Sequence, residues 1–174
     1  MNNPIVRLTV SQDPDKNEVL GEITLELYPD KAPETVRNFV SLVKSGFYEG
    51  TIFHRVIKGF MIQGGGMTAA FSEKRAAAIR GEFIANGFMA NDLKHTRGVI
   101  SMARTSDPDS ASSQFFIMHE DAPHLDAQYA GFGRVTEGME VVDKIAGVRT
   151  GRYGWYSDVP RTPIVITKAE LLSE

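Results

Sequence analysis

Apolar and polar residues alternate along two early segments of the chain, Val6 to Val10 and Glu22 to Tyr28. Alternation with a period of two is typical of strands that are buried on one face. The segment between them, Asp13 to Asn17, is rich in residues that favour turns. The pattern therefore predicts a β-hairpin near the start of the chain.

Two further segments repeat their apolar residues at helical spacing. The first helix is expected to begin near Pro33, with Asp30 as its cap, and to end at Ser45-Gly46. The second is expected after Thr136 and ends at Gly147. Their apolar faces consist of Val36, Phe39, Val40 and Val43 in the first helix and of Val141, Val142 and Ile145 in the second.

Short apolar segments separated by glycine fill the middle of the chain. They cover residues 52–57, 60–63, 99–103, 114–118 and 129–135. Many short strands at this spacing favour an antiparallel sandwich or barrel. The last strand is expected at 164–166, after a loop that holds Trp155 and Pro160. Glu73 to Ala78 could form either a short helix or an exposed loop.

The composition is that of a soluble globular protein. We expect its 174 residues, of which 42% are hydrophobic, to form a single domain over residues 1–174. A net charge of −3 gives no broad basic field for nucleic acid or an anionic membrane. The absence of cysteine excludes disulfides, thiolate metal sites and cysteine nucleophiles. Because no apolar run approaches the roughly 20 residues that span a bilayer, and no secretion signal is recognisable, the expected location is the cytoplasm.

Familiar catalytic motifs are missing from the sequence. His119 and His124 are five residues apart with Pro123 between them, whereas a helical zinc site needs histidines four apart. The four histidines are otherwise scattered, so we expect neither a metal nor a cofactor. One reaction class needs no nucleophile, general base or cofactor, because rotation about an X-Pro peptide bond breaks no covalent bond.

Such a rotation requires a fixed hydrogen-bond donor, an apolar pocket for the proline ring and a polar group that holds the neighbouring backbone. Arg55 can supply the donor, because a guanidinium stays charged and has rigidly oriented N–H groups. A strand over 53–57 and the strand that follows would bring Arg55 together with Met61 and Gln63. Spacing alone leaves two other interpretations open: Arg55 could form a surface salt bridge, and Phe60 and Met61 could be core residues.

Four longer motifs carry a more specific signal. They are FHRVIKGFMIQGG from Phe53, SMAR from Ser101, SQFFI from Ser113 and FGRVTEGMEVVD from Phe132. In this order they resemble the cyclophilin family of peptidyl-prolyl cis–trans isomerases, over nearly the whole chain, and look most like its compact bacterial members. The resemblance implies a mainly β fold, a closed eight-stranded antiparallel barrel capped by two α-helices.

The resemblance also implies a role for individual residues. Arg55 would be the catalytic donor and Gln63 would hold the substrate backbone. The pocket for the proline ring would be lined by apolar side chains, namely Phe60, Met61, Phe116 and Leu125. The groove for the residue before the proline would be formed by Ala103, Arg104 and Gln114, with His54 near the mouth of the pocket.

This chain departs from the family pattern at several positions around the same pocket. The candidate substrate-binding residues His124, Tyr129 and Arg104 replace a frequent tryptophan, a common histidine and a usual asparagine, respectively. The family's tryptophan hydrogen-bonds the inhibitor cyclosporin, so we expect a weaker affinity for cyclosporin here. Residues 68–78 also differ from the glycine-rich loop that borders the side pocket for residues preceding the proline in many relatives.

These observations predict a monomeric prolyl isomerase that acts on proline-containing peptides and unfolded protein segments and thereby assists folding. Two alternatives remain open. The first is a binding module or chaperone with the same fold that holds proline peptides without turnover. The second is a metal-dependent hydrolase that uses His119, Glu120 and His124.

Overall fold

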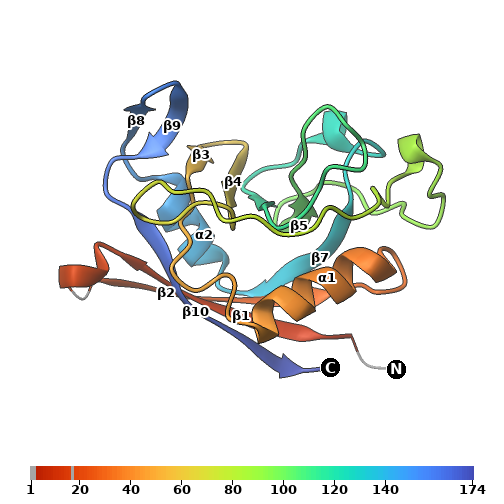
Figure 1. Ribbon diagram of the computed structural model, residues 1–174, viewed down its shortest axis with the longest axis horizontal. Coiled ribbons are helices and arrows are strands. Elements are labelled where there is room, and N and C mark those ends of the chain that lie inside the picture. Colours follow the sequence, from red (N-terminus) through yellow and green to blue (C-terminus); the bar gives the residue numbers. More distant parts are fainter. Residues whose placement is uncertain (1–2, 17) are drawn as a thin grey trace.

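Eight antiparallel strands form one strongly curled sheet in the computed structural model, which describes residues 3–16 and 18–174 (Figure 1). Their spatial order is β10-β1-β2-β7-β5-β6-β4-β3. The strands of this sheet are β1 (Ile5–Gln12), β2 (Val19–Leu27), β3 (Arg55–Ile57), β4 (Met61–Gly64), β5 (Val99–Met102), β6 (Phe115–Met118), β7 (Gly131–Glu137) and β10 (Ile164–Ser173). A separate two-stranded sheet consists of β8 (Thr150–Tyr153) and β9 (Tyr156–Pro160).

The two edges of the curled sheet meet just before β3. Ile52 forms an isolated antiparallel bridge with Val165 of β10, and the Phe53 N–H donates to the Ile164 carbonyl at 2.9 Å. The expected barrel is therefore present, although a short bridge closes it rather than a continuous ladder between β3 and β10. This closure holds the segment before β3 in place and so determines where Arg55 begins the strand.

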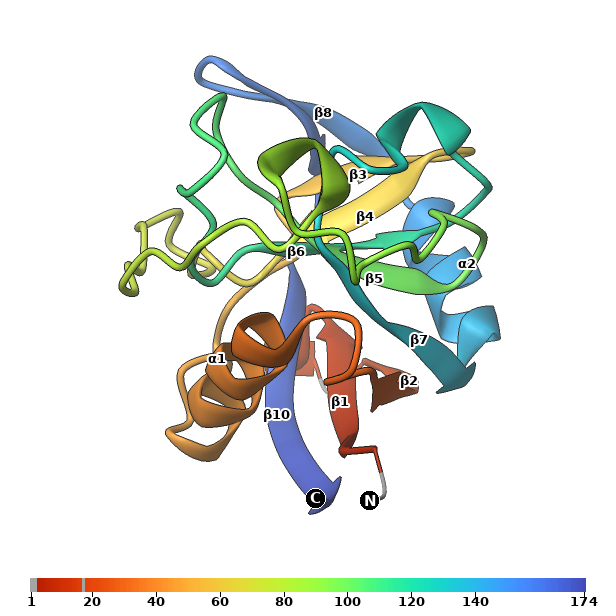
Figure 2. The same ribbon diagram turned by 90° about the vertical axis from the view of Figure 1, so that its right-hand side faces the viewer.

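Two helices cover the sheet. Helix α1 (Pro33–Lys44) packs against β10 and helix α2 (Met139–Ala146) against β2 (Figure 2). The predicted apolar faces are buried in both helices, except that Val40 is only partly buried. The ring of Phe39 lies 5.1 Å from Tyr48, 5.6 Å from Phe115 and 5.1 Å from Phe132, measured between ring centres. These aromatic rings belong to the main core, and their packing fixes α1 on the sheet.

The N-terminus of α1 is capped by a residue far away in the sequence. The prediction of Asp30 as the cap is wrong, because Ala32 occupies the N-cap position and makes no side-chain hydrogen bond. The carboxylate of Glu82 instead accepts hydrogen bonds from the N–H groups of Glu34 (3.2 Å) and Thr35 (2.7 Å) and from the Thr35 hydroxyl (2.6 Å). A carboxylate suits this position because a helix N-terminus has unpaired N–H groups and a partial positive charge.

Most predicted strands are found with boundaries shifted by a few residues. The strand expected over 52–57 is shorter and begins at Arg55, and the last strand is longer because it pairs with β1 along most of its length. The prediction of a loop around Trp155 is wrong, because this segment is the hairpin of β8 and β9. Residues 74–80 have no regular structure, which confirms the loop interpretation of that segment. The turn expected at 13–17 contains a short 3-10 helix (Pro14–Lys16), and Asn17 lies outside the described residues.

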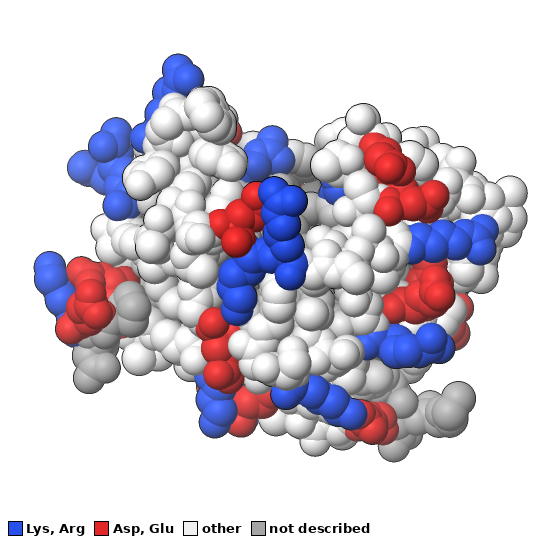
Figure 3. All heavy atoms as spheres, viewed as in Figure 1, with Lys and Arg blue, Asp and Glu red and all other residues white. Residues whose placement is uncertain are grey.

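The surface carries charges of both signs. On the face shown in Figure 3, acidic and basic side chains are mixed, and basic side chains predominate at the end of the molecule that carries β8 and β9. Among the described residues, no helix combines the length and the apolar character needed to cross a membrane.

Candidate active site

Three neighbouring strands align the residues that the first motif singled out. Arg55 of β3 lies directly opposite Gln63 of β4, and Gln63 lies directly opposite Phe116 of β6. Residues that are opposite each other in an antiparallel pair point to the same face of the sheet. Sheet register therefore places the guanidinium, the amide and the aromatic ring in one row on one face, away from the main core.

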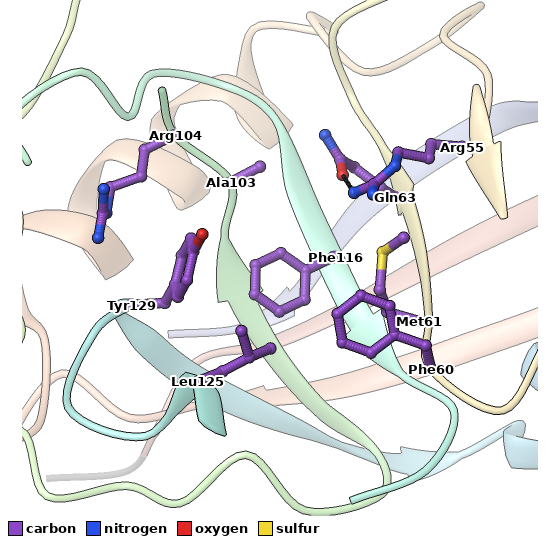
Figure 4. Close-up of a pocket in the computed structure, with 9 residues that line it drawn as sticks. All are labelled: Arg55, Phe60, Met61, Gln63, Ala103, Arg104, Phe116, Leu125 and Tyr129. Carbon is purple, nitrogen blue, oxygen red and sulfur yellow. Dashed lines mark hydrogen bonds between the residues drawn. The ribbon is translucent and has the colours of Figure 1, made fainter. Parts of the chain in front are cut away.

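A hollow of about 150 Å³ lies beside this row (Figure 4). Its lining consists of nine of the predicted site residues: Arg55, Phe60, Met61, Gln63, Ala103, Arg104, Phe116, Leu125 and Tyr129. The side chains of Met61, Phe116 and Leu125 are buried and belong to an apolar cluster separate from the main core. Adjacent residues of a strand point to opposite faces, and accordingly Phe115 belongs to the main core whereas Phe116 faces the hollow.

A chain of amide groups orients the guanidinium of Arg55. Its Nη1 donates to Oε1 of Gln63 at 3.3 Å, and Nε2 of Gln63 donates to Oε1 of Gln114 at 3.1 Å. No acidic side chain of the described residues forms a salt bridge with Arg55, so the salt-bridge interpretation that spacing left open is not supported. The exposed guanidinium therefore retains N–H groups for a ligand at the edge of an apolar hollow.

The glycine run after Gln63 makes room for this chain of amides. A Cβ atom on Gly66 would lie 2.4 Å from Cγ of Gln114, which is closer than van der Waals contact allows. Gln114 itself does not line the hollow, but it borders two neighbouring ones. The absence of a side chain at residue 66 thus lets Gln114 reach Gln63.

His54 precedes Arg55 and does not line this hollow. Its side chain is buried, and its Nδ1 has no hydrogen-bond partner among the described residues. Burial, and to a smaller extent the positive charge of Arg55, lowers the pKa of His54 from 6.5 to about 4. His54 is therefore neutral at neutral pH and adds no charge next to Arg55.

The groove beside the hollow differs in detail from what the resemblance implies. The N–H of Ala103 already donates to the Gln114 carbonyl at 3.0 Å, so it is not free to pair with a peptide. The Arg104 guanidinium lies 4.8 Å from the ring of Phe83 and 4.6 Å from that of Tyr129, and Figure 4 shows it directed away from Phe116. Its positive charge is thus held against aromatic rings as a wall of the pocket.

Two residues that replace the family's usual ones lie at the edge of the hollow. The exposed ring of His124 lies 5.7 Å from that of Phe60 at an angle of 30°, although His124 does not itself line the hollow. The ring of Tyr129 meets Phe116 edge-on at 5.7 Å. Tyr129 therefore forms part of the wall, whereas His124 supports one side of Phe60.

His95, which no sequence motif singled out, packs against Phe116. His95 is buried, with Nδ1 3.2 Å from Oδ1 of Asp126 and Nε2 2.8 Å from the Ser101 hydroxyl. Its ring stacks on Phe116 at 6.0 Å and 21°. Burial lowers the pKa of His95 despite the nearby Asp126 carboxylate. No local pattern could have revealed this role, because Asp126 is 31 residues away.

His119 holds the turn that carries Phe60. The Gly59 N–H donates to Nδ1 of His119 at 2.8 Å, and the backbone N–H of His119 donates to the Phe60 carbonyl at 2.9 Å. On its other side, Nε2 of His119 lies 3.2 Å from Oδ1 of Asp143, which in turn accepts hydrogen bonds from Arg97. His119 therefore fixes one wall of the hollow.

The residues of the hydrolase alternative do not form a metal site in the structure. Within residues 3–16 and 18–174 there is no group of three or more His, Cys, Asp or Glu side chains that could hold a metal ion. His124 lies beside Phe60, whereas His119 and Glu120 lie on the side of Arg97 and Asp143.

Comparison with known proteins identifies one family. The family model described as cyclophilin type peptidyl-prolyl cis-trans isomerase/CLD matches residues 8–171. A peptidyl-prolyl cis-trans isomerase of Acinetobacter baylyi is 51% identical over 160 residues, which cover 88% of this chain and 82% of that protein. Peptidyl-prolyl cis-trans isomerase B of Escherichia coli is 47% identical over 155 residues, which cover 84% of this chain and 91% of that protein.

Solved structures agree with these sequence relatives. A crystal structure of a cyclophilin type peptidyl-prolyl cis-trans isomerase from Cryptosporidium parvum, in the presence of the dipeptide Ala-Pro, superposes with a TM-score of 0.77 at 29% identity. The match covers 98% of this chain and 99% of that one.

Proposed function

The chain belongs to the cyclophilin-type peptidyl-prolyl cis–trans isomerases, and from this premise we propose how its pocket performs the reaction. It is an enzyme, and the reaction is rotation about the peptide bond that precedes proline. The barrier of about 18–20 kcal/mol is the amide resonance that is lost when the bond is twisted. A catalyst must therefore bind the twisted bond more tightly than the planar one.

Arg55 is the group that makes this difference in our proposal. In the twisted state the proline nitrogen becomes pyramidal and gains a lone pair, which can accept a hydrogen bond that the planar amide nitrogen cannot. A fixed guanidinium donor stabilises that state selectively. Lowering the barrier from about 20 to about 14 kcal/mol would raise the rate from about 0.01 to a few hundred per second.

The remaining residues hold the substrate in our proposal. The proline ring enters the apolar hollow between Met61, Phe116 and Leu125 and leaves its nitrogen facing Arg55. Gln63 holds a neighbouring peptide group while it orients the guanidinium. The residue before the proline runs along Ala103 and Arg104. The N–H and the carbonyl of Arg104 are the groups offered to an extended peptide, because the Ala103 N–H already donates to Gln114 and neighbouring residues of an extended segment direct these groups to opposite sides.

The single observation that supports this assignment is the cross-strand row of Arg55, Gln63 and Phe116 beside an apolar hollow. It favours turnover over the alternative of a binding module or chaperone, because mere retention of a proline peptide needs no oriented guanidinium. Our proposal extends to the physiological setting: one domain over residues 1–174 that acts in the cytoplasm as a monomer without a cofactor, on proline-containing segments of unfolded proteins.

A protease-coupled isomerisation assay on a short Ala-Pro peptide tests the proposal. Arg55→Ala should lower kcat/KM by about 30- to 1000-fold, the loss expected for one strong oriented donor of 2–4 kcal/mol. Arg37→Ala, which removes an exposed arginine from α1, is the matched control and should leave kcat/KM unchanged. Peptide binding measured by calorimetry should survive Arg55→Ala better than turnover does.

The same assay separates the alternatives. If wild-type protein binds the peptide without accelerating its isomerisation, the binding-module interpretation is correct. If the protein itself cleaves the peptide and a chelator abolishes that cleavage, the hydrolase interpretation is correct despite the absence of a metal-binding group among the described residues, because rotation about a peptide bond breaks no bond and needs no metal. If Arg55→Ala turns over as fast as wild type, Arg55 is not the catalytic donor.

A further inference from the structure

A second hollow adjoins the proline hollow on the far side of Arg55. It measures about 370 Å³ and shares two side chains with the proline hollow, Arg55 and Gln63. The rest of its lining is formed by His54, Met67, Glu73, Gln114, Trp155, Tyr156 and Ser157. A ligand that contacts the guanidinium from the proline side can therefore continue into this hollow without leaving the protein surface.

The hairpin of β8 and β9 forms one wall of this hollow and is held in place by aromatic packing. It stands next to β3, against which β9 packs (Figure 1). The ring of Phe71 stacks on Tyr153 at 4.3 Å and meets Tyr156 edge-on at 5.1 Å. Phe71 has a φ of 61°, a left-handed conformation that is costly for an aromatic residue and that the surrounding contacts must stabilise.

At the tip of the same hairpin, the indole ring of Trp155 is exposed to solvent. Trp155 follows Gly154, whose φ of 62° makes the tight turn, and its side chain is 87% exposed. Trp155 lines the same hollow as Arg55, and its exposed ring is a large apolar surface without a partner there. A side chain that stacks on Trp155 would remove this surface from water.

We propose that this hollow is a subsite for an aromatic or large apolar side chain of the peptide segment that follows the proline. The inference rests on the proposed function, because it assumes that the proline ring lies beside Phe116. The residue before the proline runs along Ala103 and Arg104, and Figure 4 shows Arg55 on the opposite side of the pocket from these two. A peptide that leaves the proline hollow past Arg55 therefore enters the second hollow, which Trp155 lines.

The lining favours an aromatic side chain over a cationic one. Trp155 and Tyr156 contribute two aromatic side chains to the lining, and the buried thioether of Met67 is a further favourable neighbour of an aromatic ring. A lysine or arginine would meet the fixed positive charge of Arg55. The carboxylate of Glu73, which could attract a cation, already pairs with Arg75 at 3.2 Å.

The only tryptophan of the chain provides a direct test. Two peptides that share the sequence up to Ala-Pro are compared, one with Phe and one with Ala at both of the following positions. At saturation, the Phe peptide should shift the emission of Trp155 to shorter wavelength and the Ala peptide should not. An absent shift, measured with a Phe peptide that competes for the proline pocket, would overturn the inference.

Turnover of the same peptides gives a second readout. Wild type should favour the Phe peptide about tenfold in kcat/KM through a lower KM, as expected for one aromatic stacking contact. Trp155→Ala should bring this ratio close to one, Trp155→Phe should preserve most of it, and Met89→Ala, an exposed apolar side chain outside the hollow, should not change it.

Failure of this inference is distinguishable from failure of the proposed function. A ratio near one in wild type, with both peptides turned over in an Arg55-dependent way, would refute the subsite alone. A third peptide, with Phe before the proline and Ala after it, tests the direction. If only this peptide is preferred, the assigned direction and therefore the subsite are refuted. Absence of turnover for both peptides would instead contradict the proposed function.

Discussion

Acid should destabilise this protein through His54. Its side chain is only 6% exposed, and its pKa in the folded state is about 4, against an ordinary value of 6.5 that the unfolded chain regains. Between these two pH values the unfolded state binds a proton that the folded state does not. The free energy of unfolding therefore falls as pH drops from 6.5 to 4, by about 1.4 kcal/mol per pH unit and about 3 kcal/mol in total.

Urea unfolding at pH 7, 6, 5 and 4 measures this effect. Between pH 7 and pH 4 the free energy of unfolding of wild type should fall. That of His54→Gln, which cannot take up a proton at this position, should fall by about 3 kcal/mol less. The control is His124→Gln, which removes an exposed histidine and should keep the acid sensitivity of wild type. Some acid sensitivity should remain in His54→Gln, because His95 is also buried with a lowered pKa. Equal slopes for wild type and His54→Gln would show that His54 is not held neutral by burial.

Three further predictions concern contacts around the pocket and the core. His119→Gln should lower kcat/KM about fivefold in the coupled assay, because it loses the acceptor for the Gly59 N–H. His119→Asn should retain most of the wild-type kcat/KM, because its Oδ1 can replace Nδ1 as that acceptor. Equal losses in the two variants would contradict a positioning role for His119. Glu82→Ala should lower the free energy of unfolding in urea by about 2–3 kcal/mol, since it leaves three donors at the start of α1 without their acceptor, and a loss below about 0.5 kcal/mol would refute this cap. His124→Trp should tighten cyclosporin inhibition about tenfold, and unchanged inhibition would show that this position does not limit affinity.

The local elements of the fold followed from periodicity. The alternating segments at residues 6–10 and 22–28 lie within paired strands except for Tyr28, which follows the end of β2, and the apolar faces of both helices are buried except for the partly buried Val40. Such patterns are informative because a strand or helix that is buried on one side must repeat its apolar residues at its own period. The hairpin around Trp155 was missed for the converse reason, since most of it is exposed and its residues show no clean alternation.

The candidate site was predictable only in part. Arg55, Gln63 and Phe116 could be named from their motifs, and sheet register explains why they meet, because β4 pairs with both β3 and β6. The supporting residues could not be named. His95 and His119 are placed below and beside the pocket by partners 31 and 60 residues away, respectively.

The amino-acid sequence alone determined most of the helices and strands and the chemistry of the side chains that each one carries. The tertiary structure decided which distant groups complete them: Glu82 caps α1, Arg104 contacts the rings of Phe83 and Tyr129, and Trp155 lines a hollow next to Arg55. The reason is physical. Periodicity records only whether a side chain is buried or exposed, whereas the partner of a buried polar group depends on how the curled sheet brings remote segments into contact.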